Sequence, residues 1–287
     1  VMILVTGASG HVGGRAAALL AERGCDLRLM SRRPSAGTVP DVGPVVQADY
    51  AEPDTLDAAF ENVDVAFLVS GYAEPGTRAQ LHKNAIDAAA RAGVRHLVYL
   101  SFQGAGPDSA FPLSRDHHQT EQALAAAGVA YTALRDNLYL DLIPELFGPD
   151  GVVRGPAGDG TVAWVSREDV AQTVAAALAN PAAHAGTYDV TGPEALSLTE
   201  TAARLSGLLG KELRYEEESV DEGRAWRRQL DVPEWEVETW LGSYQAIAAG
   251  ELAEPSDTVE RFTGQSPARL DDYFAEHPGL LEPLREA

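Results

Sequence analysis

Three glycines, Gly7, Gly10 and Gly13, recur at three-residue intervals in the segment ILVTGASGHVGG. A strand pattern precedes them and a helix pattern follows, which is the setting in which a glycine-rich turn binds the pyrophosphate of a dinucleotide. Gly7 would permit the tight turn, Gly10 the approach of the phosphates, and Gly13 the close packing of helix on strand. Amides at the helix N-terminus would face the phosphates. The alternative is a glycine-rich turn without a ligand. The other predicted cofactor contacts in this loop are Ser9, His11 and Val12.

Two adjacent arginines, Arg32 and Arg33, follow the second predicted strand in the segment LMSRRP. Enzymes that use NAD usually place an acid here against the ribose hydroxyls, whereas those that use NADP place arginine against the 2′-phosphate. Asp26 lies at the start of the strand, too far from its ribose end to be that acid. The pair therefore favours NADP(H), and the alternative is two ordinary surface residues.

The ends of the later strands supply the remaining expected pocket residues. Asp49 and Tyr50 follow the third strand and are predicted near the adenine, and the fourth strand leads into Val69 and Ser70 on the way to the nicotinamide. The expected acceptor contacts are Phe102, which would also touch the cofactor, with Gln103, Asn137 and Tyr139.

Ser101 ends the fifth strand and is predicted to face the nicotinamide, both as a cofactor contact and as a catalytic residue. Its alternative role is to cap the following loop. His117, in the segment RDHHQTEQ, is the first candidate for a proton donor, because imidazole titrates near neutrality and the helix register aims it at the cleft. Its alternative is an ordinary helix histidine. A metal site with Glu121 is rejected, since the adjacent His117 and His118 cannot share one helix face.

A tyrosine and a lysine four residues apart on one helix can protonate a carbonyl as hydride arrives, because the lysine charge lowers the pKa of the phenol. The only two lysines, Lys83 and Lys211, are preceded four residues earlier by Ala79 and Gly207. Alcohol oxidation, ketone reduction or sugar epimerisation by such a dyad is therefore not expected. Reduction of an electron-poor quinone needs less catalytic help from the protein, because binding and orientation can suffice.

Apolar runs alternate with alanine-rich helical stretches, which predicts an α/β protein with a Rossmann-type doubly wound parallel sheet and a smaller C-terminal α/β lobe. We expect a cofactor-binding domain over 1–150, with 151–287 holding the remainder of the sheet and the substrate lobe. The expected strands cover 2–6, 26–30, 44–47, 63–69, 94–100 and 130–134. The expected helices cover 11–23, 54–61, 77–92 and 116–127. Gly93 and Gly128 are expected to end helices, and Ser166 and Ser197 to open them.

The chain has 287 residues and a formal charge of −21, which argues against nucleic acid or an anionic membrane as its main partner. It lacks an apolar run long enough to span a bilayer and an evident leader, and a single cysteine, Cys25, fits a reducing compartment. We expect a cytoplasmic monomer or homodimer without a metal, acting on a small molecule.

With these residues in place, the chain resembles the NmrA-like group of atypical short-chain dehydrogenases, and within it the NADPH:quinone oxidoreductase 2 type. The resemblance runs through VTGASGHVGG, SRRP, QADY, RAGVRHLVYLS, HHQTEQALAAAGVAYTALRDNLY, AGDGTVAWVSREDVA and GTYDVTGPEALSLTE. It implies NADP(H) in the cleft, with Gly7, Gly10, Gly13 and Arg32 at cofactor positions.

The same resemblance places His117 where other dehydrogenases carry the catalytic tyrosine, and Glu121 where they carry the lysine. Asp136 departs from the proline or small residue expected in LRDN. The leading expectation is an NADPH-dependent reductase of a quinone or similar electron-poor acceptor. The alternative is a non-catalytic NADP(H)-binding redox sensor of the NmrA kind. An epimerase or ketoreductase, which the fold alone would suggest, lacks its dyad here.

Overall fold

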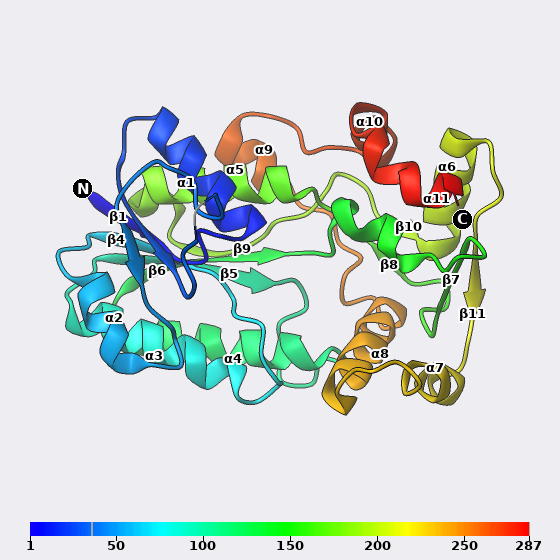
Figure 1. Cartoon of the computed structure of the whole chain (residues 1–287), viewed down its shortest axis with the longest axis horizontal. Coiled ribbons are helices and arrows are strands. Elements are labelled where there is room, and N and C mark those ends of the chain that lie inside the picture. The colour runs from blue at the N-terminus through cyan, green and yellow to red at the C-terminus, as the bar shows by residue number, and fades with distance from the viewer. Residues whose placement is uncertain (36, 287) are drawn as a thin grey trace.

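The computed structural model describes residues 1–35 and 37–286, and its centre is a seven-stranded sheet (Figure 1). Every neighbouring pair of its strands is parallel. In spatial order the strands are β3 (Val45–Gln47), β2 (Asp26–Ser31), β1 (Met2–Val5), β4 (Val65–Leu68), β5 (His96–Phe102), β6 (Ala130–Asp136) and β9 (Gly186–Asp189). This is the 3-2-1-4-5-6 order of the doubly wound Rossmann sheet with one strand added, so the predicted fold class and all six predicted strands are confirmed.

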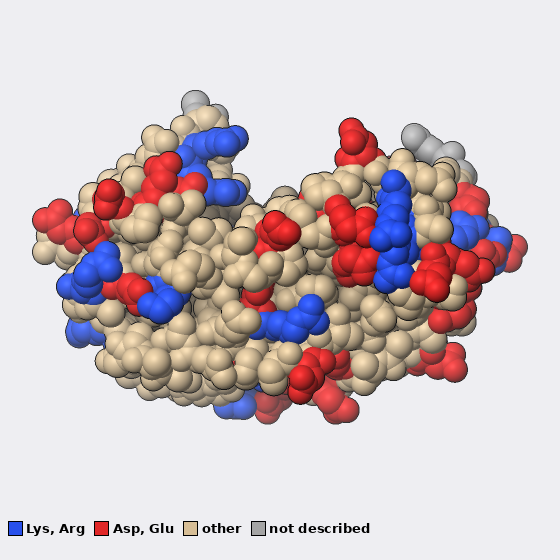
Figure 2. Space-filling view, turned by 90° about the horizontal axis from the view of Figure 1, so that it is seen from below, with Lys and Arg blue, Asp and Glu red and all other residues tan. Residues whose placement is uncertain are grey.

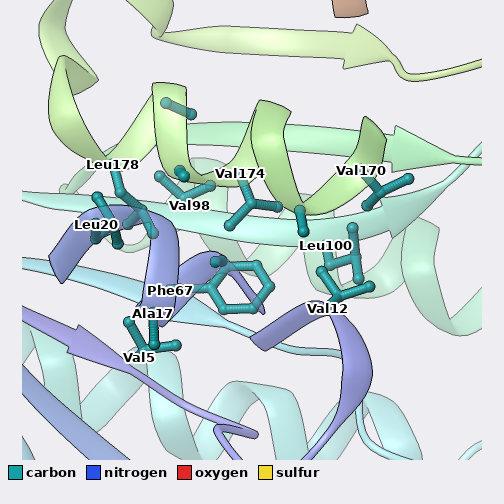
Figure 3. Close-up of a cluster of buried hydrophobic side chains, with 14 of the residues drawn as sticks. Val5, Val12, Ala17, Leu20, Phe67, Val98, Leu100, Val170, Val174 and Leu178 are labelled. Atoms are coloured by element: carbon teal, nitrogen blue, oxygen red, sulfur yellow. The ribbon is translucent and has the colours of Figure 1, made fainter. Parts of the chain in front are cut away.

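Helices cover both faces of the sheet (Figure 1). One face carries α1 (His11–Glu22) and α5 (Arg167–Ala179), and the other carries α2 (Pro53–Phe60), α3 (Arg78–Arg91) and α4 (Pro112–Ala126). Figure 3 shows the first face, where Ala17 and Leu20 of α1 meet strand residues such as Phe67. Small alanines on α1 and α5 let these two helices pack against each other directly above the sheet.

The ends of the helices follow their sequence signals. Gly93 and Gly128 take left-handed φ values of 77° and 71° just after α3 and α4. The Ser166 hydroxyl accepts the amide of Asp169 at the start of α5. Ser197 and Glu200 form a complete capping box that opens α6 (Leu198–Leu209). These four boundaries are therefore confirmed, whereas α4 begins at Pro112 and not at the predicted residue 116.

The second half of the chain adds α5 and β9 to the sheet layer and builds the lobe from segments on both sides of them. The lobe has its own buried core and two small strand pairs, antiparallel β10–β8 and parallel β11–β7. The predicted division after residue 150 stays a prediction. The remaining elements are η1 (Leu140–Leu146), β7 (Val152–Gly155), β8 (Thr161–Val162), η2 (Pro181–His184), β10 (Leu196–Ser197), β11 (Arg214–Glu217), α7 (Val220–Arg227), α8 (Glu234–Ala248), α9 (Thr258–Thr263), α10 (Leu270–Glu276), η3 (Pro278–Leu281) and α11 (Glu282–Glu286).

The lobe lies beyond the carboxyl ends of the strands, toward which β5 and β9 point (Figure 1). Figure 2 shows the surface hollowed between the sheet layer and the lobe. Open α/β sheets bind their ligands at this edge, so the arrangement directs attention to the strand ends. None of the helices in the described part of the chain is both long and apolar enough to cross a membrane.

Candidate cofactor and substrate site

The glycine loop between β1 and α1 is built so tightly that two of its positions exclude a side chain. Gly7 has φ +61°, and a Cβ there would lie 2.5 Å from Cγ1 of Val69. A Cβ on Gly13 would lie 2.5 Å from the carbonyl oxygen of Gly7. Gly10 caps α1 without a side-chain hydrogen bond, which leaves the amides of the first helical turn without intrahelical acceptors. The loop therefore has the close approach and the free donors that a pyrophosphate needs.

A cavity of about 450 Å³ opens beside this loop, at the carboxyl ends of β1, β2 and β4. This volume is typical of small-molecule sites. Nine of the predicted cofactor residues line it, namely Gly7, Ser9, Gly10, Arg32, Arg33, Asp49, Tyr50, Val69 and Ser70. The other predicted contacts, His11, Val12, Gly13, Ser101 and Phe102, lie outside this lining. The sequence did not single out the rest of the wall, which is Thr6, Met30, Ser31, Gly71, Tyr72 and Leu81.

Arg32 and Arg33 stand exposed at the rim of the cavity, directly after β2. Within residues 1–35 and 37–286, neither guanidinium forms an ion pair. Their strand is fixed to the glycine loop, because the amide of Ala8 donates to the carbonyl of Met30 at 3.1 Å. Two uncompensated positive charges are thus held beside the phosphate-binding turn, where they fit the 2′-phosphate of NADP(H).

Asp49 and Tyr50 are held by the protein on their side of the cavity. One carboxylate oxygen of Asp49 accepts the amide of Ala51 at 2.9 Å. The buried hydroxyl of Tyr50 lies 2.7 Å from Oγ1 of Thr6 and donates to the carbonyl of Val69 at 3.2 Å. Tyr50 therefore presents its ring, with its hydroxyl already engaged, to the predicted adenine position.

The loop after β4 reaches the cavity through Gly71, and buried side chains hold both polar groups of its backbone. The Arg78 Nε donates to the Gly71 carbonyl at 2.5 Å, and the Gly71 amide donates to Nε2 of His82 at 2.9 Å. Both side chains come from α3, and Arg78 is 4% exposed and His82 1%. These two residues, which the sequence did not single out, fix a backbone segment of the cavity wall.

His117 lies in the interior instead of facing the cleft, which corrects the predicted orientation. It is 4% exposed, Arg78 donates to its Nε2 at 3.1 Å, and its Nδ1 lies 2.8 Å from the Tyr99 hydroxyl. Arginine can only donate, so Nε2 is the acceptor and Nδ1 carries the proton of a neutral ring. Burial and the Arg78 charge lower the pKa of His117 well below 6.5. This placement suits a positioning residue better than a proton donor.

Ser101 is also turned inward, toward α4. It is fully buried, and its hydroxyl donates to Oε1 of Glu121 at 2.5 Å. Arg135 from β6 binds the same carboxylate with two hydrogen bonds of 2.8 and 2.6 Å. The position matched to the dehydrogenase lysine thus holds the acidic half of an ion pair between α4 and β6. The Ser101 hydroxyl is thus engaged inside the protein, and its contact with the nicotinamide stays a prediction.

Gln103 and Asn137 join the ends of β5 and β6 to the segment that leads out of α8. Asn137 donates to Oε1 of Gln103 at 2.6 Å and to the carbonyl of Leu252 at 3.0 Å. Gln103 donates to the carbonyl of Glu254 at 2.8 Å. Both side chains are under 5% exposed. The side-chain amides of both residues are used in these internal contacts. Their role in binding the acceptor stays a prediction, and neither has a free polar group to offer.

Phe102 and Tyr139 bring aromatic rings to the same edge. Phe102 packs between Phe111 and His117, at centroid distances of 5.3 and 6.1 Å. Tyr139 donates its hydroxyl to Oδ2 of Asp136, and the guanidinium of Arg167 lies 5.2 Å from the centre of its ring. The edge between β6 and α5 therefore combines an aromatic wall, a buried carboxyl group and a cation.

Two buried neutral histidines should make the fold sensitive to acid. Burial first, and then the Arg78 charge, lower the pKa of His82 from 6.5 to about 3 and that of His117 in the same direction. Below pH 6.5 these two histidines bind protons in the unfolded chain but stay neutral in the folded chain, so the free energy of unfolding falls as the pH falls. The expected loss is on the order of 1 kcal/mol per pH unit for each ring.

His82→Gln removes one of the two rings. We therefore expect the combined loss of unfolding free energy from the two histidines to fall by about half, measured by urea unfolding between pH 7.5 and 5. Comparing variants cancels the opposite contribution of buried carboxyl groups. His118→Gln, at a partly exposed neighbour, serves as the control. An unchanged slope in His82→Gln would contradict the buried neutral state.

The sheet order, the glycine loop and the cavity together define a dinucleotide-binding protein. A model of the NAD(P)H-binding family matches residues 7–181. The (4-alkanoyl-5-oxo-2,5-dihydrofuran-3-yl)methyl phosphate reductase of Streptomyces griseus is 37% identical over 98% of this chain and 100% of its own length. Quinone oxidoreductase 2 of Escherichia coli is 32% identical over 94% of this chain and 96% of its own.

The structure of the NADPH-dependent quinone oxidoreductase from Escherichia coli, solved with NADPH, superposes with a TM-score of 0.86 at 28% identity, covering 96% of this chain and 99% of that one. NmrA, a negative transcriptional regulator solved with NAD, superposes with a TM-score of 0.77 at 19% identity, covering 99% and 98%. The second likeness concerns the fold alone. The chain belongs to the NAD(P)H-binding family and is related to NAD(P)H-dependent oxidoreductases. The predicted resemblance and the predicted cofactor class are confirmed.

Proposed function

We propose that this protein is an NADPH-dependent reductase of a quinone or a similarly electron-poor, conjugated acceptor. The observation that carries the proposal is the cavity that runs from the tight glycine loop to Arg32 and Arg33, which have no ion-pair partner in the described part of the chain. Gly7, Gly10 and the first turn of α1 would hold the pyrophosphate, and the two arginines the 2′-phosphate. When bound, the reduced nicotinamide supplies a hydride. The protein binds and orients the reactants in the hollow beneath the lobe.

The choice of acceptor rests on what this chain does not provide. No tyrosine–lysine dyad is present, and the positions matched to it are His117, buried and neutral, and Glu121, paired with Arg135. A simple ketone needs such a dyad, because its alkoxide product must be protonated as it forms. A quinone or an acyl-substituted unsaturated lactone delocalises the added charge. Two relatives are named for acceptors of this kind.

Tyr72 and Trp235 help to shape the mouth of the proposed site. Tyr72, from the loop after β4, lines the cavity, and its ring lies 5.3 Å from that of Trp235 on α8 of the lobe. Aromatic surfaces at this junction suit a planar acceptor. The lobe would therefore take part in substrate choice.

A second candidate, a redox sensor that binds NADP(H) without turnover, is favoured by one observation. The side chains of Ser101, Gln103, Asn137 and His117 are committed to internal hydrogen bonds. A sensor needs a cofactor site and a surface for a partner but no reactive group. Turnover of NADPH decides between the two candidates.

We further propose a small-molecule partner and a cytoplasmic location.

The test is steady-state NADPH consumption with benzoquinones, naphthoquinones and an acyl-substituted unsaturated lactone, against a simple ketone. We expect kcat/KM for the conjugated acceptors to exceed that for the ketone by about 100-fold or more, because the localised alkoxide of the ketone depends on the missing tyrosine–lysine dyad. Ketone reduction at a comparable rate would contradict the proposed acceptor class.

A further inference from the structure

Asp136 is a buried carboxyl group at the carboxyl edge of the sheet, where the sequence led us to expect proline or a small residue. It ends β6 and lies directly opposite Phe102 of β5. Its backbone carbonyl accepts the amide of Gln103 at 2.7 Å, which fixes its position on that edge. The residue is 4% exposed. Burial disfavours the charged form of an acidic group, so an acid at this position is unexpected on stability grounds alone.

The immediate partner of this carboxyl group is a phenol. The Tyr139 hydroxyl donates to Oδ2 of Asp136, and Tyr139 is itself fixed by the pairing of its backbone with Val165 and by Arg167 over its ring. Among the described residues, Oδ1 of Asp136 has no hydrogen-bond partner and Asp136 has no ion-pair partner. One carboxyl oxygen is thus anchored while the other is left to a ligand or to water.

The charged and titratable groups around Asp136 come from four elements. Arg78 of α3 attracts its charged form, but the guanidinium is occupied by Gly71, Leu113 and His117. His117 of α4 is neutral, and Arg167 of α5 and Asp141 of η1 act on Tyr139. Burial outweighs the opposing effects of Tyr139 and Arg78, and raises the pKa of Asp136 to about 7. An acid with such a pKa can both give and regain a proton at neutral pH.

Arg78 links this carboxyl group to the cofactor cavity. The same guanidinium that influences Asp136 holds the carbonyl of Gly71, which lines the cavity. The ends of β4, β5 and β6 are consecutive in the sheet, so Gly71, Phe102 and Asp136 follow one another along the edge at which ligands bind. Asp136 therefore lies on the same edge of the sheet as the cavity, two strands along from β4.

We propose that Asp136 donates the proton that completes reduction of the acceptor, with Tyr139 as the residue that positions its carboxyl group. This inference rests on the proposed reductase function. The acceptor gains one hydride from the reduced nicotinamide and one proton from Asp136. The hydride forms a new bond at one end of the conjugated system, whose π electrons shift onto a carbonyl oxygen, and that oxygen takes the proton. The nicotinamide is oxidised, and water reprotonates the Asp136 carboxylate.

The first test is the pH profile of kcat/KM for a naphthoquinone. The donor must be protonated, so the wild-type value should fall as the pH rises through about 7. Asp136→Asn should lower kcat/KM by about 100-fold, the low end of a general-acid contribution, and flatten this fall, with NADPH affinity within about 3-fold of wild type. Tyr139→Phe removes a hydrogen bond that lowers the pKa of Asp136, so its fall should move to higher pH.

Asp116→Asn is the matched control, because Asp116 is a second buried carboxyl group, which accepts the amide of Gly76. It should keep the wild-type profile. Wild-type kcat/KM and pH dependence in Asp136→Asn would overturn the proposal. If that variant does not fold, an unshifted profile in Tyr139→Phe would overturn it.

An infrared titration with NADPH bound separates failure of the inference from failure of the proposed function. Wild type should show a carboxylic-acid band that disappears as the pH rises through about 7 and is missing in Asp136→Asn. A band that persists in Asp136→Asn would overturn the inference. A band that behaves as expected, with no NADPH oxidation by any acceptor, would overturn the reductase function and the proton-donor role with it.

Discussion

Arg32→Ala combined with Arg33→Ala should weaken NADPH binding about 100-fold and leave NADH binding within about 2-fold. Charged hydrogen bonds contribute about 1.5–3 kcal/mol each, so losing two corresponds to at least about 3 kcal/mol. The 2′-phosphate is the group that only NADPH carries. Both arginines stand at the cavity rim without ion-pair partners among the described residues, so their loss leaves no buried carboxylate behind. The measurement is calorimetric titration with each dinucleotide.

The control for this variant removes the same charge elsewhere. Arg91→Ala with Arg95→Ala takes two positive charges from ion pairs with Asp57 and Asp64, away from the cavity. On a chain of formal charge −21, any general repulsion of an anionic cofactor would appear in this control as well. Equal losses for NADPH and NADH in Arg32→Ala/Arg33→Ala would contradict the assignment to NADP(H).

Gly13→Ala should abolish measurable NADPH binding at cofactor concentrations that saturate the wild type. The added Cβ would lie 2.5 Å from the Gly7 carbonyl oxygen and 2.9 Å from that of Thr6. Both contacts are backbone, so α1 must move away from the loop or the loop must open. Overpacking of this kind costs about 1–3 kcal/mol of stability. The displaced amides would no longer converge on the pyrophosphate.

A matched glycine shows whether the effect is local. Gly207 lies inside α6, and a Cβ there meets nothing within 4 Å. Gly207→Ala should stabilise the protein by about 0.5–1 kcal/mol and leave NADPH binding unchanged. Thermal unfolding with and without NADPH measures both effects. A Gly13→Ala protein that is still stabilised by NADPH as wild type is would show that the loop does not bind the pyrophosphate.

The sheet could be predicted because its signals are local. Each strand is a short apolar run, and glycines such as Gly93 and Gly128 mark where a helix must stop before the next strand begins. The cavity wall at Arg32 and Arg33 follows from the same logic, because the position after β2 is fixed by the order of the strands.

The orientation of His117 could not be predicted in this way. Its face of α4 does point inward, as its buried neighbours Thr120 and Leu124 show. What lies inward there depends on Arg78 and Tyr99, which come from α3 and β5. Helical periodicity gives the direction of a side chain but not the partner that it meets. The same holds for Ser101, whose partner Glu121 lies 20 residues further along the chain.

For Asp136, the sequence pointed to the residue but not to its surroundings. The sequence marked it as a departure from the expected residue, but only the structure shows that it is buried, bonded to Tyr139 and set on the ligand-binding edge. Arg78 gave no signal at all, because an arginine in the first turn of a helix is ordinarily exposed. Its burial depends on acceptors from several segments of the chain.

The most direct test of the central claim is a single-turnover experiment. The protein is loaded with NADPH without oxygen and mixed with a naphthoquinone, and the absorbance band of the reduced nicotinamide is followed in time. Loss of the band at a rate that depends on the acceptor and exceeds the uncatalysed rate, with NADPH preferred over NADH, is the result that a reductase requires. Tight NADPH binding with no loss of the band for any acceptor would contradict it, and would make the protein an NADP(H)-binding sensor.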